Sequence, residues 1–215
     1  IGWGASGRNG GFCCVGGTGL QPRGMIRRFG LDAARAWYRS QVQAVELVRD
    51  LARDEDIDVE AFGAAEVEIA HSPRAFARLE SDHRAMTELL GLDAELLTRY
   101  EVSERIHDSA QQHGALISRP ALGLHPLRFC RGLALAASLR GARLHSDSEV
   151  LDWSRSADGG HRLRTAGGTL RAAKVLFATN GFMPEHLRAE FHGRTLPVVS
   201  AIVVTRPLSD DERLD

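Results

Sequence analysis

The stretch Gly2-Trp-Gly-Ala-Ser-Gly-Arg-Asn-Gly-Gly11 decides how this chain folds, together with Val175-Leu-Phe-Ala178 and the Thr179-Asn-Gly181 that follows it. Glycine-rich backbone beside Ser, Arg and Asn can wrap around a phosphate or a flat ring, because glycine leaves backbone N–H groups open to a ligand. The run 175–178 is continuously apolar, which predicts a strand buried on both faces. Open α/β sheets bind their ligands where such strands end in small polar turns. The two segments together predict a cofactor site in an α/β fold.

Gly2, Gly4 and Gly7 formally match the dinucleotide fingerprint G-x-G-x-x-G, which would indicate an NAD-dependent dehydrogenase. That motif requires a preceding strand, a following helix and an acid about 20 residues further on. In this chain no strand precedes Gly2, more glycine follows, and Asp32 at that distance looks like the N-cap of a helix. The context therefore argues against the literal fingerprint.

Composition restricts the class of protein. With 215 residues, 43% hydrophobic and 26% charged, the chain can form one or two domains with a sizeable core. A net charge of −1 offers no surplus to neutralise phosphates, which argues against a nucleic-acid partner. No apolar run reaches the length of about 18 residues that a membrane helix needs. Cys13, Cys14 and Cys130 have neither C-x-x-C nor zinc spacing, and we expect reduced thiols in a cytoplasmic protein.

Capping residues predict three main helices. The first should run from an Asp32 N-cap to about residue 53, the second from Ser72-Pro73 to Gly91, and the third from His125-Pro126 to Gly141. Residues 92–109 are polar and give no clear prediction.

Short runs of alternating or β-branched residues predict strands between these helices. The dipeptides Gly159-Gly160 and Gly167-Gly168 are hairpin signals, so the last three runs should form a three-stranded meander. The expected strands are Glu66–Ile69, His113–Ser118, Ala142–His145, Glu149–Trp153, His161–Thr165 and Thr169–Ala172.

In this order, the segments resemble the FAD-dependent amine and amino-acid oxidases of the D-amino-acid oxidase/glycine oxidase group, especially the branch similar to gamma-glutamylputrescine oxidoreductases. The stretches G-A-S-G-R-N-G-G, H-P-L-R-F and A-T-N-G carry this likeness. It implies an α/β fold: an FAD-binding doubly wound, glutathione-reductase-like sheet with a three-stranded β-meander, plus a partial α+β substrate domain. The FAD-binding domain is expected at 1–61 and 122–193 and the substrate-binding domain at 62–121 and 194–215, both incomplete.

The resemblance also implies which residues contact FAD. Along the pyrophosphate and ribityl chain would lie Ser6, Gly7, Arg8 and Asn9, with Gly10 and Gly11 nearer the flavin ring. The turn after the buried strand would contact FAD through Thr179, Asn180 and Gly181. The backbone of Val150 would pair with adenine. The alternatives are a glycine-rich surface loop and an ordinary turn. Phe12 is a departure, because relatives commonly carry a polar residue there.

The activity that the resemblance implies is oxidation of the C–N bond of a small amine or amino acid to an imine, with a substrate like gamma-glutamylputrescine favoured. A sarcosine, glycine or D-amino-acid oxidase of the same family and a non-catalytic flavin-binding module remain alternatives. The resemblance places the dinucleotide fingerprint upstream of Ile1, so we expect a fragment that is inactive by itself and binds FAD poorly. No catalytic residue stands out, since a flavin carries the redox chemistry. The nine histidines lack H-x-x-x-H spacing, and no metal is expected.

Overall fold

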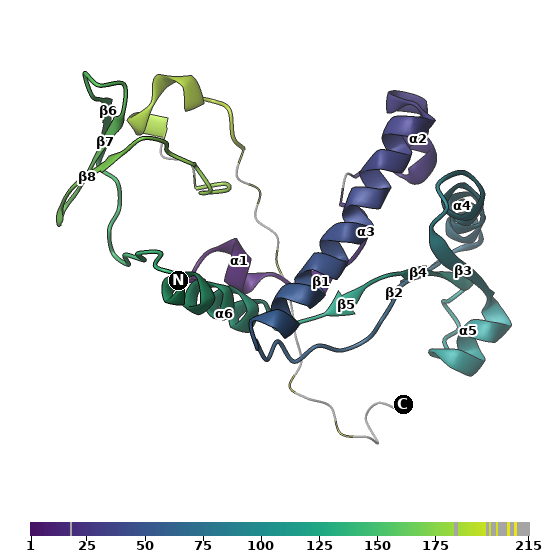
Figure 1. Cartoon of the computed structure of the whole chain (residues 1–215). Helices are drawn as coiled ribbons and strands as arrows, with labels where there is room; N and C mark the ends of the chain where they lie inside the picture. Colours follow the sequence, from purple (N-terminus) through teal and green to yellow (C-terminus); the bar gives the residue numbers. More distant parts are fainter. Residues whose placement is uncertain are drawn as a thin grey trace. The chain divides into compact units, whose positions relative to one another are not determined.

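The computed structural model of this chain describes residues 1–17, 19–182, 185–196, 198, 201, 206 and 209. Its internal contacts divide the chain into two compact units, residues 2–137 and residues 138–215 together with Ile1. Both are drawn in Figure 1, and each is described by itself. Within the described residues, no helix has both the length and the apolar character needed to cross a membrane.

The 2–137 unit combines helices with two small antiparallel sheets (Figure 1). Strands β2 (Glu66–Ile69), β4 (Gly114–Arg119) and β3 (Asp93–Thr98) form one sheet in that order, and β1 (Phe12–Cys13) pairs with β5 (Leu122–Gly123). Its helices are α1 (Ala5–Arg8), α2 (Pro22–Phe29), α3 (Leu31–Asp54), α4 (Pro73–Arg84), the π-helical turn η1 (Ala85–Leu89), α5 (Arg99–Arg105) and α6 (Pro126–Leu139), the last of which ends two residues beyond the unit.

Local capping chemistry explains where the helices begin. The Ser72 hydroxyl accepts a hydrogen bond from the Ala75 backbone N–H at 3.2 Å, and Pro73 occupies the first turn, so the predicted start of α4 is confirmed. The prediction that Asp32 caps α3 is wrong. Gly30, with φ of 85°, precedes the helix, and Asp32 lies inside the first turn, where its negative charge still interacts favourably with the helix dipole.

The unassigned stretch 92–109 contains both β3 and α5. Thr98 and Glu101 form a capping box between these elements: the Thr98 hydroxyl accepts from the Glu101 N–H, and the Glu101 carboxylate accepts from the Thr98 N–H at 2.8 Å. These hydrogen bonds hold the pKa of Glu101 below its ordinary value. The T-x-x-E pattern is a recognisable sequence signal that would have located this helix start.

Alternation along β4 gives the sheet two different faces. Leu116 packs in a cluster with Leu79 of α4, whereas Ala115 and Ile117 belong to a cluster with Val102 of α5. Helices α4 and α5 therefore cover opposite faces of the same sheet, as residues i and i+1 of a strand point to opposite sides. A third cluster joins Met25 of α2 to α3.

The unit after residue 137 is built on a meander of β6 (Asp152–Arg155), β7 (His161–Thr165) and β8 (Gly168–Ala172), followed by the short 3-10 turns η2 (Glu185–Leu187) and η3 (Ala189–Phe191). The predicted meander is confirmed, although β6 begins three residues later than expected. Its register, with Arg155 opposite His161, is closed by a turn through Gly159 at a φ of 84°.

Two strand predictions in this unit are wrong. Residues 142–145 are exposed and form no strand, and residues 175–178 pair with no strand among the described residues. Leu176 is 89% exposed, whereas the ring of Phe177 stacks on Trp153 with centroids 4.9 Å apart. The side of this segment that carries Phe177 therefore packs against Trp153 of β6. The described residues offer no second layer and no parallel neighbour, and all their strand pairs are antiparallel.

Candidate functional site

The 6–11 loop is shaped by close contact of the chain with itself. A Cβ on Gly7 would lie 2.1 Å from the Gly2 carbonyl oxygen, and one on Gly11 would lie 2.0 Å from the Leu124 carbonyl oxygen. Gly11 also has φ of 73°, which a residue with a side chain rarely adopts. We expected these glycines to open the backbone to a ligand. The structure shows that Gly7 and Gly11 are also required for the loop to pack on the segments before and after it, and their contact with a ligand remains a prediction.

Asn9 holds the shape of this loop. Its Nδ2 donates to the carbonyl oxygens of Ala5 and Ser6 at 3.0 and 3.1 Å, and its Oδ1 accepts from the Gly11 N–H at 2.9 Å. The side chains of Ser6 and Arg8 are exposed, and the Arg8 guanidinium lies 5.2 Å from the centre of the Trp3 ring. A hydroxyl donor and a cation are therefore presented on a loop of fixed shape, with the half-buried Gly10 between Asn9 and Gly11.

An aromatic pair borders the loop. Gly123 of β5 pairs with Phe12 on one side of the strand and with Phe62 on the other. Residues paired directly across neighbouring strands point to the same face, so all three share one face of this small sheet. The Phe62 ring occupies the space where a Gly123 side chain would stand, and Phe12 is 82% exposed. No sequence motif indicates Phe62, although a glycine inside a strand does signal that another group approaches closely.

Val150 and Thr179 line one cavity of about 520 Å³ within the second unit, with apolar side chains of β7, β8 and residues 175–177. Neither the N–H nor the C=O of Val150 has a hydrogen-bond partner in the described part of the chain. Residues 179–182 form a turn in which the Phe182 N–H donates to the Thr179 carbonyl at 3.0 Å and Asn180 adopts φ of 51°. Gly181 completes this turn. The predicted turn is thus confirmed, and its contact with FAD remains a prediction.

The predicted cofactor residues therefore fall into two groups. Residues 6–11 lie together in the first unit, and Val150 lies with residues 179–181 in the second. The structure brings the members of each group together.

The adjacent cysteines are poor nucleophiles. The Cys14 thiol is hydrogen-bonded to Glu66, and burial, followed by the negative charge of Glu66, raises the pKa of this thiol to about 11. Burial also raises the pKa of Cys13, and all three cysteines are free. Because the thiolate is the reactive form, these shifts disfavour a redox or covalent role for the pair at neutral pH.

We expect Cys14 to react slowly with iodoacetamide at about pH 8, at least about tenfold more slowly than free cysteine, because little thiolate is present. The rate should increase until the pH passes about 11, the pKa of this thiol. Glu66→Gln removes a negative charge, lowers that pKa and should accelerate the reaction. The measurement is mass-spectrometric alkylation in a background without Cys13 and Cys130. A rate equal to that of free cysteine would contradict the assignment.

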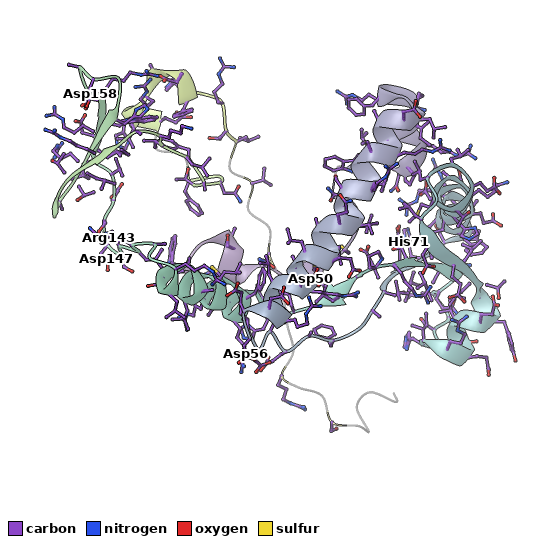
Figure 2. All side chains as sticks on the ribbon, viewed as in Figure 1. Asp50, Asp56, His71, Arg143, Asp147 and Asp158 are labelled. Carbon is purple, nitrogen blue, oxygen red and sulfur yellow. The ribbon has the colours of Figure 1, made fainter. Side chains whose placement is uncertain are left out.

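Metal-ligating side chains and the charge run at the end of α3 are two further features of the described residues. Among the described residues, no three His, Cys, Asp or Glu side chains are placed to hold a metal ion. The charge run at the end of α3 is exposed to solvent: Arg53 pairs with Asp50 at 2.8 Å and with Asp54 at 2.9 Å. Figure 2 shows Asp50 and Asp56 on this segment. His125 precedes α6 and its Nδ1 accepts from the Arg128 N–H at 3.5 Å, consistent with the predicted helix entry.

Comparison with known proteins identifies the family. The family model described as DAO, FAD dependent oxidoreductase, matches residues 1–215. The chain belongs to this family. It is 27% identical over 216 residues to gamma-glutamylputrescine oxidoreductase of Escherichia coli (strain K12), covering 98% of this chain and 48% of that protein. The chain thus spans about half the length of the curated relatives it matches.

Solved structures of DAO-type enzymes share its fold. Glycine oxidase from Geobacillus kaustophilus superposes with a TM-score of 0.65 at 23% identity, covering 85% of this chain and 47% of that one. L-alpha-glycerophosphate oxidase from Mycoplasma pneumoniae, solved with FAD bound, gives a TM-score of 0.60 at 16% identity, covering 84% and 45%. The predicted family and its α/β fold class are confirmed.

Proposed function

We propose that the full-length protein is an FAD-dependent oxidoreductase that oxidises the C–N bond of a small amine or amino acid to an imine. The observation that carries this proposal is the family match over all 215 residues. The names of the relatives, gamma-glutamylputrescine oxidoreductase and glycine oxidase, favour amine substrates. We propose gamma-glutamylputrescine or a similar glutamylated diamine as the first substrate to test, with sarcosine, glycine and D-amino acids as the alternatives.

The two groups of predicted residues fit the chemistry of FAD. The Ser6 hydroxyl and Arg8 guanidinium are exposed donors suited to phosphate oxygens, on a loop held by Asn9 and by the packing of Gly11. The N–H and C=O of Val150 have no hydrogen-bond partner among the described residues, and they are one donor and one acceptor, the pair that an adenine edge requires. Bound flavin supplies the electron acceptor for amine oxidation. The residues of this chain bind and orient the cofactor and the amine, and they exclude water.

The division into domains follows from the same proposal. We assign 1–61 and 122–193 to FAD binding and 62–121 and 194–215 to substrate binding. Much of 194–215 lies outside the described residues. The three-stranded sheet between α4 and α5 falls wholly within the proposed substrate-binding part.

The test is the absorbance of the purified full-length protein, reconstituted with FAD and desalted. We expect the oxidised flavin band to remain with the protein, and anaerobic addition of an amine substrate to bleach it. Absence of the band would refute FAD binding. A stable band that no amine bleaches would favour a non-catalytic flavin module, for which the exposed Phe12 beside the loop is the motivating observation.

Substrate preference is tested by kcat/KM across gamma-glutamylputrescine, putrescine, sarcosine, glycine and D-alanine, since specificity is a ratio of these values. We expect the glutamylated diamine to give the highest value. A higher value for sarcosine, glycine or the D-amino acid would overturn the substrate assignment and leave the amine-oxidase proposal intact.

A further inference from the structure

A cavity of about 250 Å³ lies on the α4-covered face of the β2–β4 edge of the sheet, beside the loop residues 15–17 and 19–22. The register of β2 against β4 explains why polar side chains line one side of this cavity. Glu66 pairs with Ser118 and Glu68 with Leu116, so these four side chains share the face that packs toward α4. The remaining walls come from α3, α4, η1 and the loop, and they include Tyr38, Asp82, Met86, Val15, Leu20 and Gln21.

The cavity carries more negative than positive charge. Glu68 forms an ion pair with Arg78. Glu66 has no cation within ion-pair distance among the described residues, and its carboxylate bonds the uncharged Cys14 thiol. Asp82 on α4 contributes a further carboxylate, whose pKa is raised by burial although the positive charges of Arg78 and Arg23 oppose this shift.

Asp82 is the decisive residue, because it is only 5% exposed and incompletely bonded. The side-chain amide of Gln21 has one orientation in which both its nitrogen and its oxygen are hydrogen-bonded. In that orientation the nitrogen donates to Asp82 Oδ2 at 3.1 Å, and the oxygen accepts from Arg78 Nη1 at 3.2 Å. No hydrogen bond reaches Asp82 Oδ1 from any residue that the structure describes. A buried carboxylate normally has partners for both oxygens, whereas Oδ1 of Asp82 accepts no hydrogen bond from the described residues, and Asp82 lines the cavity.

We propose that this cavity binds the ammonium group of an alkylamine, with Asp82 as its principal ion-pair partner and Glu66 beside it. The inference rests on the proposed amine oxidation and adds a binding group for the substrate's cationic end. An ammonium brings three N–H donors and one positive charge, which match Oδ1 of Asp82 and the uncompensated charge of Glu66. The apolar side chains of Val15, Leu20 and Met86 suit the methylene groups that precede it.

The same geometry disfavours a metal ion as the occupant. In the described part of the chain no set of three His, Cys, Asp or Glu side chains could coordinate one, and Glu68 is already engaged by Arg78. Carboxylates at one end of a cavity with an apolar wall suit an organic cation, which carries both a charge and methylene groups.

The ionised form of Asp82 lowers folding stability. Burial raises its pKa in the folded protein, so the native state holds this proton more tightly than the unfolded chain does, and stability falls as the pH rises through that pKa. Asp82→Asn removes this penalty while keeping the shape of the side chain, so we expect the variant to fold. The melting temperature verifies that it does.

The first experiment compares Asp82→Asn with Glu80→Gln in the full-length, FAD-reconstituted protein. Glu80 is an exposed carboxylate on the same helix and serves as the matched control. With gamma-glutamylputrescine as substrate, we expect Asp82→Asn to raise KM about tenfold or more, with a much smaller change in kcat, because a charged hydrogen-bonded contact is lost. Glu80→Gln should leave KM within about twofold. Glu66→Gln is the second variant and should raise KM by a smaller factor.

The second experiment measures binding without turnover. Calorimetry should show that putrescine binds the full-length protein at least about tenfold more tightly than the uncharged 1,4-butanediol, and that Asp82→Asn abolishes this difference. Equal binding of diamine and diol, or an unchanged KM in Asp82→Asn, would overturn the ammonium site. A protein that retains FAD but is bleached by no amine would instead refute the proposed oxidation, and calorimetry would still decide the site.

Discussion

Gly11→Ala is expected to destabilise the protein by about 3 kcal/mol and to lower the amount of FAD bound per chain. The added Cβ would lie 2.0 Å from the Leu124 carbonyl oxygen, and the backbone at φ of 73° is strained for alanine. The loop can relieve the clash only by moving away from Leu124, which breaks the hydrogen bond from the Leu124 N–H to the Gly11 carbonyl at 2.9 Å. Urea unfolding and flavin absorbance after desalting measure the two effects.

Gly24→Ala is the matched control for this substitution. Gly24 lies inside α2, and its added Cβ would meet only the Leu20 side chain, at 3.8 Å, an ordinary contact distance. Since alanine favours a helix interior over glycine, we expect this variant to gain about 0.5–1 kcal/mol and to keep its FAD. Wild-type stability and FAD content in Gly11→Ala would show that the loop does not depend on its contact with Leu124.

Leu79→Ala is expected to destabilise the protein by about 2–5 kcal/mol. Leu79 is fully buried at 0% exposure, in the cluster that joins α4 to Leu116 of the central strand. Removing its side chain loses the apolar contacts and leaves a cavity that this small core can fill only in part. Thermal or urea unfolding, followed by circular dichroism, measures the loss.

Leu47→Ala provides the comparison for that core substitution. Leu47 lies on α3 and is 56% exposed, so the same change of side chain should alter stability by no more than about 0.5 kcal/mol. Similar losses in the two variants would mean that the cluster beneath α4 does not stabilise the sheet.

Local features of this protein are readable from the sequence. Ser72-Pro73 specifies a helix start through one hydroxyl and one fixed φ angle, and the glycine pairs of the meander specify hairpins. The signal at Thr98 and Glu101 was equally present and was overlooked. Such features depend on hydrogen bonds and torsion angles within a few residues, so no distant part of the chain is needed to define them.

The candidate cofactor site was only partly predictable. The sequence motifs point to the 6–11 loop and the 179–181 turn, and their contact with FAD remains a prediction. The motifs did not predict that Asn9 bonds the loop's own carbonyls, because those bonds exist only once the one-turn helix α1 has formed. Phe62 was missed since its place over Gly123 depends on strand pairing across 61 positions of sequence.

The sequence by itself determined the family, the helix caps and the meander, because each depends on short patterns of residue type. The tertiary structure decided what is buried. It shows that residues 175–178, apolar throughout, are covered on one face by Trp153 and leave Leu176 exposed. It also places Asp82 of α4 beside Glu66 of β2 at one cavity. Burial and charge pairing depend on which segments, distant in the sequence, come into contact, and only the folded chain defines those contacts.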